Sequence, residues 1–228
     1  MSLPGRLLRR LAAARSTIIA PLGAGWGDEL KVIRETRARV PLLLSDAAAL
    51  HIRIAVRATR GLNGAMAEAG VFAGASARLI CEGKGDVPFH LFDVFDTLQN
   101  SAPGPSPAEA DVRAHFGTTH GCLAEVRTLL APYPAVHFHP GVFPASAAGL
   151  EDERFSFVHL DLDLPRATLA GLDFFVPRLV AGGILIGDDY ADAEVRATFA
   201  AFFANRHDTI IELPWAQVMV VKQGARQG

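Results

Sequence analysis

The sequence predicts a layered α/β fold built on a mostly parallel sheet, and two observations lead to this prediction. From residue 64 onward, short apolar segments of strand length alternate with segments of helical periodicity. Within that alternation, residues 155–160 form an apolar strand, residues 166–180 a helix ended by the glycines at 182–183, and residues 184–186 a second apolar strand. A strand, a helix and a strand in this order form the unit from which parallel sheets are made.

The other elements are assigned from the same signals. Ser45 is the expected N-cap of a helix over residues 45–60. A stretch rich in Pro, Ser and Ala, residues 96–117, is expected to cross the mouth of a site and to contain a short helix that begins near Pro107. Further helices are expected at residues 3–14, 28–40, 75–79, 122–130 and 190–205, and further strands at residues 65–69, 89–93, 135–139, 209–213 and 217–222, the last two as a hairpin-like pair.

The composition fits one main globular domain with an extension. The chain has 228 residues and a mass of 24.3 kDa, which we divide into an N-terminal helical extension, residues 1–60, and a main domain, residues 61–228. The net charge of -2 gives no electrostatic case for nucleic acid, and no apolar run reaches the roughly 18 residues of a membrane span. Two distant cysteines and arginines spread through residues 1–26 predict a cytoplasmic protein without a secretory signal. The apolar extension favours a homodimer.

Acidic residues follow both strands of the 155–190 unit. Asp161 and Asp163 come after the first strand, and Asp188 and Asp189 come after the second. If these strands are parallel neighbours, about 4.8 Å apart, the four acids meet at the sheet edge where such folds bind ligands. Like charges this close raise one another's pKa unless a cation relieves them, and carboxylates suit Mg²⁺ or Mn²⁺. The alternative is that some of the four cap the following helices, and the residues alone do not decide which would be ligands.

A turn with glycines follows the strand at 65–69. Gly70 and Gly74 allow a ligand to approach the backbone, but Glu68 places a negative charge where a pyrophosphate would lie. The turn therefore favours a ligand with an ammonium group, and S-adenosylmethionine is such a ligand. Asp93, at the end of the next strand, is the type of residue that binds the ribose hydroxyls of an adenosine. The alternative for Glu68 is a solvated acid or one at a helix N-terminus.

Four segments of the chain resemble one family. EAGVFAGASARLI, FDVFDTL, FVHLDLDL and RLVAGGILIGDDY are similar, in order and spacing, to the TylF/MycF family of class I S-adenosylmethionine-dependent O-methyltransferases, over about residues 64–222. The resemblance implies a Rossmann-like, mostly parallel sheet of seven strands with helices on both faces. It also implies methyl transfer to a hydroxyl of a small molecule, such as a sugar or a phenol.

The resemblance also implies roles for individual residues. It implies a magnesium site made by Asp161, Asp188 and Asp189, with Asp163 as general base, so that Asp161 and Asp163 carry the catalytic step. The segment at residues 164–168, LPRAT, departs from the Tyr-Glu-Ser-Thr-like continuation of the family. Cofactor contacts are implied for Glu68, Gly70, Phe72, Gly74, Ser76, Asp93 and Phe95.

Two alternatives stay open at this point. A metal-dependent glycosyltransferase would explain Asp161 and Asp163, but it gives no purpose to the glycine turn or to the second pair of acids. A non-catalytic S-adenosylmethionine-binding protein of the same fold would fit the altered segment after Asp163. Near the sheet, several histidines and aromatic residues are interpreted as structural, namely His137, His139, His159, Tyr190 and Trp215.

Overall fold

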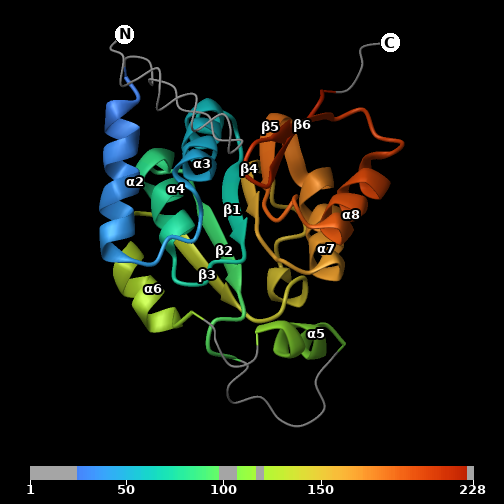
Figure 1. The fold of residues 1–228 in the computed structure, drawn as a ribbon, viewed down its shortest axis with the longest axis horizontal. Coiled ribbons are helices and arrows are strands. Elements are labelled where there is room, and N and C mark those ends of the chain that lie inside the picture. Colours follow the sequence, from blue (N-terminus) through green and yellow to red (C-terminus); the bar gives the residue numbers. More distant parts are fainter. Residues whose placement is uncertain (1–24, 98–106, 117–120, 225–228) are drawn as a thin grey trace, which may run out of the picture.

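The structure is a computed structural model that describes residues 25–97, 107–116 and 121–224. Its seven-stranded sheet has the order β3-β2-β1-β4-β5-β7-β6 (Figure 1). β1 to β5 are parallel, and β7 runs antiparallel to both β5 and β6. The strands are β1 (Ala65–Ala69), β2 (Phe89–Asp93), β3 (Val136–Pro140), β4 (Phe155–Leu160), β5 (Leu179–Gly187), β6 (Thr209–Leu213) and β7 (Gln217–Val221).

Helices cover both faces of the sheet, as predicted (Figure 1). α3, α4 and α6 pack on one face, and α7 and α8 pack on the other. α2 lies outside α3 and α4, while α5 lies beyond the carboxyl ends of the strands. The helices are α2 (Gly27–Arg39), α3 (Asp46–Thr59), α4 (Ala75–Lys84), α5 (Pro107–Phe116), α6 (Leu123–Leu130), α7 (Pro165–Phe175) and α8 (Ala193–Phe203), with short 3-10 turns at η2 (Ala145–Ala147) and η3 (Val176–Arg178).

Most predicted elements are confirmed. β1, β2, β4 and β6 have the predicted bounds, and β6 and β7 form the expected antiparallel pair. Ser45 is the N-cap of α3, where its side chain accepts a hydrogen bond of 3.1 Å from the backbone N–H of Ala48. β4 and β5 are parallel neighbours, so the acids that follow these two strands lie at the same edge of the sheet.

The predicted end of the helix that begins near residue 166 is wrong. α7 ends at Phe175, η3 contains Pro177, and β5 already begins at Leu179. Proline lacks a backbone N–H and cannot continue an α-helix, so it is this residue that ends the helical segment. Gly182 lies inside β5 with φ +78°, and the β4–β5 register shifts near this end of the strands. Glycine here marks an irregularity in a strand rather than a helix stop.

The N-terminal part is described from residue 25. The predicted helix at 3–14 lies outside the described residues, and the homodimer stays a prediction. The division at residue 60 also stays a prediction, although α3 packs directly on α4 and on the sheet. No helix in the described ranges is long and apolar enough to cross a membrane.

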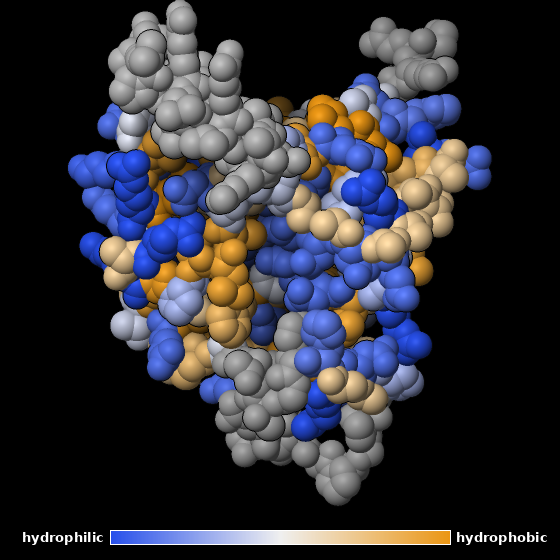
Figure 2. Space-filling model, viewed as in Figure 1, coloured by the Kyte–Doolittle hydropathy of each residue, from blue (hydrophilic) through white to orange (hydrophobic). Residues whose placement is uncertain are grey.

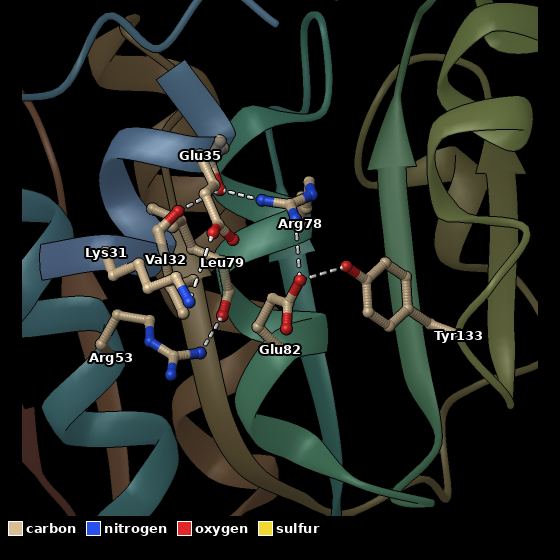
Figure 3. Close-up of polar contacts among 9 residues, drawn as sticks. Lys31, Val32, Glu35, Arg53, Arg78, Leu79, Glu82 and Tyr133 are labelled. Atoms are coloured by element: carbon tan, nitrogen blue, oxygen red, sulfur yellow. Dashed lines mark hydrogen bonds and ion pairs between the residues drawn. The ribbon is translucent and has the colours of Figure 1, made fainter. Parts of the chain in front are cut away.

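Polar contacts join the three helices α2, α3 and α4 (Figure 3). Arg78 of α4 is 3% exposed, donates a hydrogen bond to the Thr36 hydroxyl of α2 and pairs with Glu82 at 2.8 Å. Arg53 of α3 donates to the backbone carbonyl of Leu79 at 2.9 Å. Arg53 also pairs with Glu29 of α2 at 2.6 Å. Because both arginines are buried and each has an acidic partner, they fix how α2 and α3 lie against α4.

Three histidines lie side by side on β2 and β3. His90 is buried, its ring stacks on those of His137 and His139, and its Nδ1 lies 3.0 Å from Nε2 of His139. Burial and the neighbouring imidazoles of His139 and His137 lower the pKa of His90 to about 4. The interpretation of His137 and His139 as structural histidines agrees with this stacking.

The depressed pKa of His90 predicts a pH-dependent stability. In the unfolded chain His90 takes up a proton near its ordinary pKa of about 6.5, whereas in the folded protein it does so only near 4. Between these values the unfolded state binds more protons, so the free energy of unfolding should fall as the pH is lowered. Chemical unfolding of wild type and His90→Phe at pH 4 to 7 should show a shallower fall in the variant, with a difference of up to about 2 to 3 kcal/mol across the range.

The control is His207→Phe, which removes an exposed histidine that follows α8. It should reproduce the wild-type profile. A His90→Phe profile parallel to that of the wild type would show that His90 does not resist protonation in the folded protein.

Candidate active site

The four acidic residues after β4 and β5 lie together at the carboxyl edge of the sheet. The backbone N–H of Asp161 donates to Ala69 O at 2.8 Å, and that of Asp188 donates to Leu160 O at 2.9 Å, so both tips remain hydrogen-bonded to the neighbouring strand. One carboxylate oxygen from each of Asp161, Asp163 and Asp189 lies within 4.8 Å of the others. One carboxylate oxygen of Asp188, one of Asp161 and one ring nitrogen of His159 also lie within 4.8 Å of one another. We call Asp161, Asp163, Asp188 and Asp189 the acid cluster.

The backbone of the acid cluster is strained. Asp163 has φ +56° and Asp189 has φ +57°, in the left-handed region that non-glycine residues rarely adopt. Such a conformation costs on the order of 1 kcal/mol or more and persists only where the surrounding structure holds it. Both strained residues direct their carboxylates into the same cluster, which is the pattern expected of a ligand site.

Burial and mutual repulsion shift the protonation of the cluster. Burial raises the pKa of Asp161 well above its usual range, and the neighbouring Asp188, Asp189 and Asp163 act in the same direction. Burial and the adjacent Asp189 carboxyl raise the pKa of Asp163 to about 7. The pKa of Asp189 is also raised, by burial and by Asp188. The folded protein therefore holds these negative charges at an energetic cost.

The acid cluster has the properties of a divalent-cation site. Oδ2 of Asp189 is buried and has no hydrogen-bond partner among the described residues. Carboxylate oxygens around an octahedral Mg²⁺, at about 2.0 to 2.1 Å from the ion, lie about 3 to 4 Å from one another, and oxygens that already lie within 4.8 Å of one another need little movement to reach this spacing. A cation at this position would complete the coordination of the orphaned oxygen and offset the repulsion between the carboxylates.

The glycine turn after β1 lies against the acid cluster. A Cβ added to Gly70, which has φ +90°, would lie 1.6 Å from the backbone oxygen of Asp161, so only glycine fits there. Asp93 fixes the other side of the turn, where Oδ2 accepts from the N–H groups of Val71 and Phe72 at 2.6 and 2.8 Å and Oδ1 accepts from Phe95 at 2.7 Å. The turn and the acid cluster are therefore built as one unit.

One cavity of about 960 Å³ joins the turn to the acid cluster. It is large enough for two small-molecule ligands. α5 and the connection between α2 and α3 contribute to its wall, and Figure 2 shows an orange strip left of centre, in the region where that connection and the turn after β1 lie. In the connection, Leu43 is 82% exposed. Trp215, interpreted from the sequence as core, is 51% exposed at this cavity, so that interpretation is wrong; Tyr190 is 7% exposed, as expected of a core residue.

The seven residues predicted to contact a cofactor fall into two groups. Gly70, Phe72, Ser76 and Asp93 line the cavity. The other three are not part of its wall. Direct cofactor contact stays a prediction for all seven, and each of the second group has another role in the structure: Glu68 binds His159, Gly74 has φ +82° and faces Val126, and Phe95 is fully buried.

A row of buried polar side chains lies beneath the acid cluster. His159 on β4 donates from Nδ1 to Glu68 Oε1 on β1 at 2.7 Å and lies 3.4 Å from Asp188 Oδ2 through Nε2. Gln217 on β7 donates from Nε2 to the same Asp188 oxygen at 3.1 Å, and His51 on α3 lies 2.9 Å from Gln217 Oε1 through Nδ1. Glu68, His159 and Gln217 have no exposed surface. We call Glu68, His159, Gln217 and His51 the polar row.

The charge state of the polar row follows from its geometry. Although burial disfavours the imidazolium, hydrogen bonds to Asp188 and Glu68 raise the pKa of His159 well above its ordinary value. Burial raises the pKa of Glu68, against the opposing effect of His159. Glu68 and Asp188 are among the residues predicted from the sequence, whereas neither spacing nor motif indicates Gln217 or His51. His159 and Asp161 are two residues apart, and side chains two residues apart on a strand project from the same face of the sheet. This spacing is the sequence feature that indicates where His159 lies.

The fold is that of solved O-methyltransferases. The O-methyltransferase NovP matches with a TM-score of 0.66 and 20% identity, over 86% of this chain and 88% of that chain. An O-methyltransferase from Bacillus cereus in complex with SAH matches with a TM-score of 0.56 and 14% identity, over 95% and 97% of the two chains. At these identities the likeness shows the fold alone.

The chain belongs to the macrocin O-methyltransferase (TylF) family, whose model matches residues 48–221. A relative from Streptomyces olivaceus, 8-demethyl-8-(2,3-dimethoxy-alpha-L-rhamnosyl)-tetracenomycin-C 4'-O-methyltransferase, is 30% identical over 142 residues, which is 58% of this chain and 54% of the relative. The chain thus spans about half the length of that relative. The resemblance drawn from the motifs is confirmed, and the glycosyltransferase interpretation loses its support.

The burial of Asp161 and the repulsion from its neighbours predict that one substitution will stabilise the protein. Asp161→Asn removes a buried carboxyl group whose pKa is raised and which therefore destabilises the folded protein near neutral pH. In the presence of a chelator at pH 7 to 8, the free energy of unfolding should increase by on the order of 1 kcal/mol. Asp173→Asn, the same change at an exposed position of α7, should have no measurable effect. A destabilised Asp161→Asn variant would show that the negative charge of Asp161 is already satisfied within the chain.

Proposed function

We propose that the protein is an S-adenosylmethionine-dependent O-methyltransferase that requires a divalent cation, and that it methylates a hydroxyl of a small molecule. The observation that carries the proposal is the acid cluster, which opens into the same cavity as the glycine turn. Membership of the family supports the reaction class. The names of the Streptomyces olivaceus relative and of the solved structures support a hydroxyl acceptor.

The residues around the cavity divide between the two ligands. Gly70, Phe72, Ser76 and Asp93 would hold the methyl donor, because they line the part of the cavity that contains the exposed backbone of the turn. Within the acid cluster, Asp161, Asp188 and Asp189 would hold Mg²⁺ or Mn²⁺, and Asp163 would remain beside them as a base. Placing both ligands in one cavity orients the reactants, which can supply up to roughly 7 to 11 kcal/mol of the barrier reduction in ideal cases.

The chemistry requires an acceptor oxygen that loses its proton. When bound, S-adenosylmethionine would supply an electrophilic methyl group, with the thioether as leaving group, and a cation would supply Lewis acidity that lowers the pKa of nearby hydroxyls. Asp163 would accept the hydroxyl proton at its carboxylate, and its position in the cavity beside Asp161 suits that role.

The cavity also indicates the kind of acceptor. Two neighbouring hydroxyls would bind a cation better than one, as in sugars and catechol-like rings. The cavity wall also contains apolar residues, among them Phe143, Leu164 and Trp215. An acceptor with a vicinal diol at one end and an apolar body at the other would match both parts.

Asparagine substitutions test the cation site. Asp161→Asn and Asp188→Asn should lower divalent-cation-dependent turnover by about 100-fold or more, because amide oxygens are weaker ligands than carboxylates, while S-adenosylmethionine binding measured by calorimetry stays close to that of the wild type. Turnover is measured as transfer of a mass-shifted methyl group to a panel of sugars and phenols with vicinal hydroxyls. Full turnover in chelator would contradict the cation requirement. Cofactor binding without cation binding or turnover would support a non-catalytic protein of the same fold.

Asp163→Asn tests the general base. The variant should lose about 100-fold or more in turnover number while its affinity for S-adenosylmethionine is unchanged, because the hydroxyl proton loses its acceptor. Asp173→Asn on α7 is the matched control, being exposed and not part of the cavity wall. Wild-type turnover by Asp163→Asn across pH 6 to 9 would mean that another group, or the cation alone, removes the proton.

A further inference from the structure

We propose that Gln217, oriented by His51, is a positioning residue that sets the direction of the Asp188 carboxylate toward the cation. This proposal rests on the cation site of the proposed function. The observation behind it is that one oxygen of Asp188, Oδ2, is the acceptor for Gln217 Nε2 at 3.1 Å and faces His159 Nε2 at 3.4 Å. Contacts that converge on one oxygen leave the other, Oδ1, for a ligand in the cavity.

The packing around Gln217 and Asp188 restricts both side chains. Gln217 is the first residue of β7, has no exposed surface, and lies on the face of the sheet that α3 covers. Asp188 is 9% exposed and follows β5, the strand that pairs with β7. Without the amide donor, Oδ2 of this buried carboxylate would keep only the longer contact to His159, and the side chain could rotate.

His51 completes the hydrogen bonds of the Gln217 amide. Its Nδ1 lies 2.9 Å from Gln217 Oε1, and since a carbonyl oxygen can only accept, the Nδ1–H must donate. A flipped amide would place its oxygen against the Asp188 carboxylate, which is a repulsive contact, and would require the other tautomer of His51 to accept from its NH₂ group. In the observed orientation the half-buried His51 on α3 supplies the donor for Gln217 Oε1, so His51 supports the orientation of the amide that binds Asp188.

A neutral donor is suited to this position. Lysine or arginine at residue 217 would also bind Asp188, but its charge would offset the negative charge that attracts a cation. The glutamine amide holds the carboxylate without neutralising it. Residues that orient a metal ligand in this way typically change metal affinity by about 10- to 100-fold when they are replaced.

The experiment measures Mn²⁺ binding to the cofactor-free protein by electron paramagnetic resonance, with unfolding midpoints measured alongside. Gln217→Met keeps the size of the side chain but loses both hydrogen bonds, and should bind Mn²⁺ about 10-fold or more weakly than the wild type. His51→Leu, which acts only through Gln217, should show a smaller loss of about 2- to 5-fold. The double variant should be no weaker than Gln217→Met alone, because both changes act on one contact to Asp188.

Ser156→Ala is the matched control. Ser156 on β4 is fully buried and donates to Gly64 O and Ala65 O, at the opposite end of the strand from the acid cluster. It should destabilise the fold as a lost buried hydrogen bond does while leaving Mn²⁺ affinity unchanged. Equal Mn²⁺ affinity in Gln217→Met and wild type would overturn the role of Gln217 and leave the cation site standing.

Two further outcomes separate the alternatives. Absence of Mn²⁺ binding by the wild type would overturn the cation site itself, and the role of Gln217 with it. If Gln217→Met does not fold, His51→Leu carries the test, because it changes a half-buried side chain and leaves β7 intact. An unchanged affinity in that variant would then count against the proposal, and additive losses in the double variant would show that His51 acts on the site by another route.

Discussion

The structure of the site depends on the parallel pairing of β4 with β5. This pairing is made by the backbone, ends in the hydrogen bond from Asp188 N–H to Leu160 O, and is stabilised by strand residues with no exposed surface, such as Val158 and Leu185. Strands so paired lie about 4.8 Å apart whatever follows them. Burial of apolar side chains in the strands therefore forces together carboxylates that would separate if they were free to do so. The repulsion is a consequence of the fold, and a bound cation would offset it.

Opposite charge reaches the acid cluster from below. His159 contacts Asp188 through Nε2, and through Nδ1 it also contacts Glu68. His115 of α5 acts on Asp163, whose pKa it lowers against the larger effect of burial. The polar row thus approaches electrical balance by itself and leaves the acid cluster with an excess of negative charge. The contacts of the buried row hold side chains in place, while the acids above it carry the excess of negative charge that a cation would offset.

Much of this arrangement could be predicted from the sequence, because strand periodicity and the place where each strand ends fix which side chains meet at the sheet edge. Asp161 and Asp188 were found in this way, and β1, β2 and β4 have the expected bounds. Gln217 and His51 could not be found, because their contact depends on how β7 and α3 approach β5 in three dimensions. The predicted end of the helix is wrong because Pro177, which precedes the two glycines, already ends the helical segment.

The glycine turn after β1 is joined to the acid cluster by direct contacts within one sheet edge. Ala69 O accepts from Asp161 N–H, and Gly70 leaves room for the backbone oxygen of the same aspartate. Asp93 in turn binds the amides that follow Gly70. Three strand ends are thus coupled through short backbone contacts, so a displacement of the turn would be transmitted to Asp161. Two ligands bound at this edge would be held at a separation set by the sheet itself, and that fixed separation is what an in-line transfer between them requires.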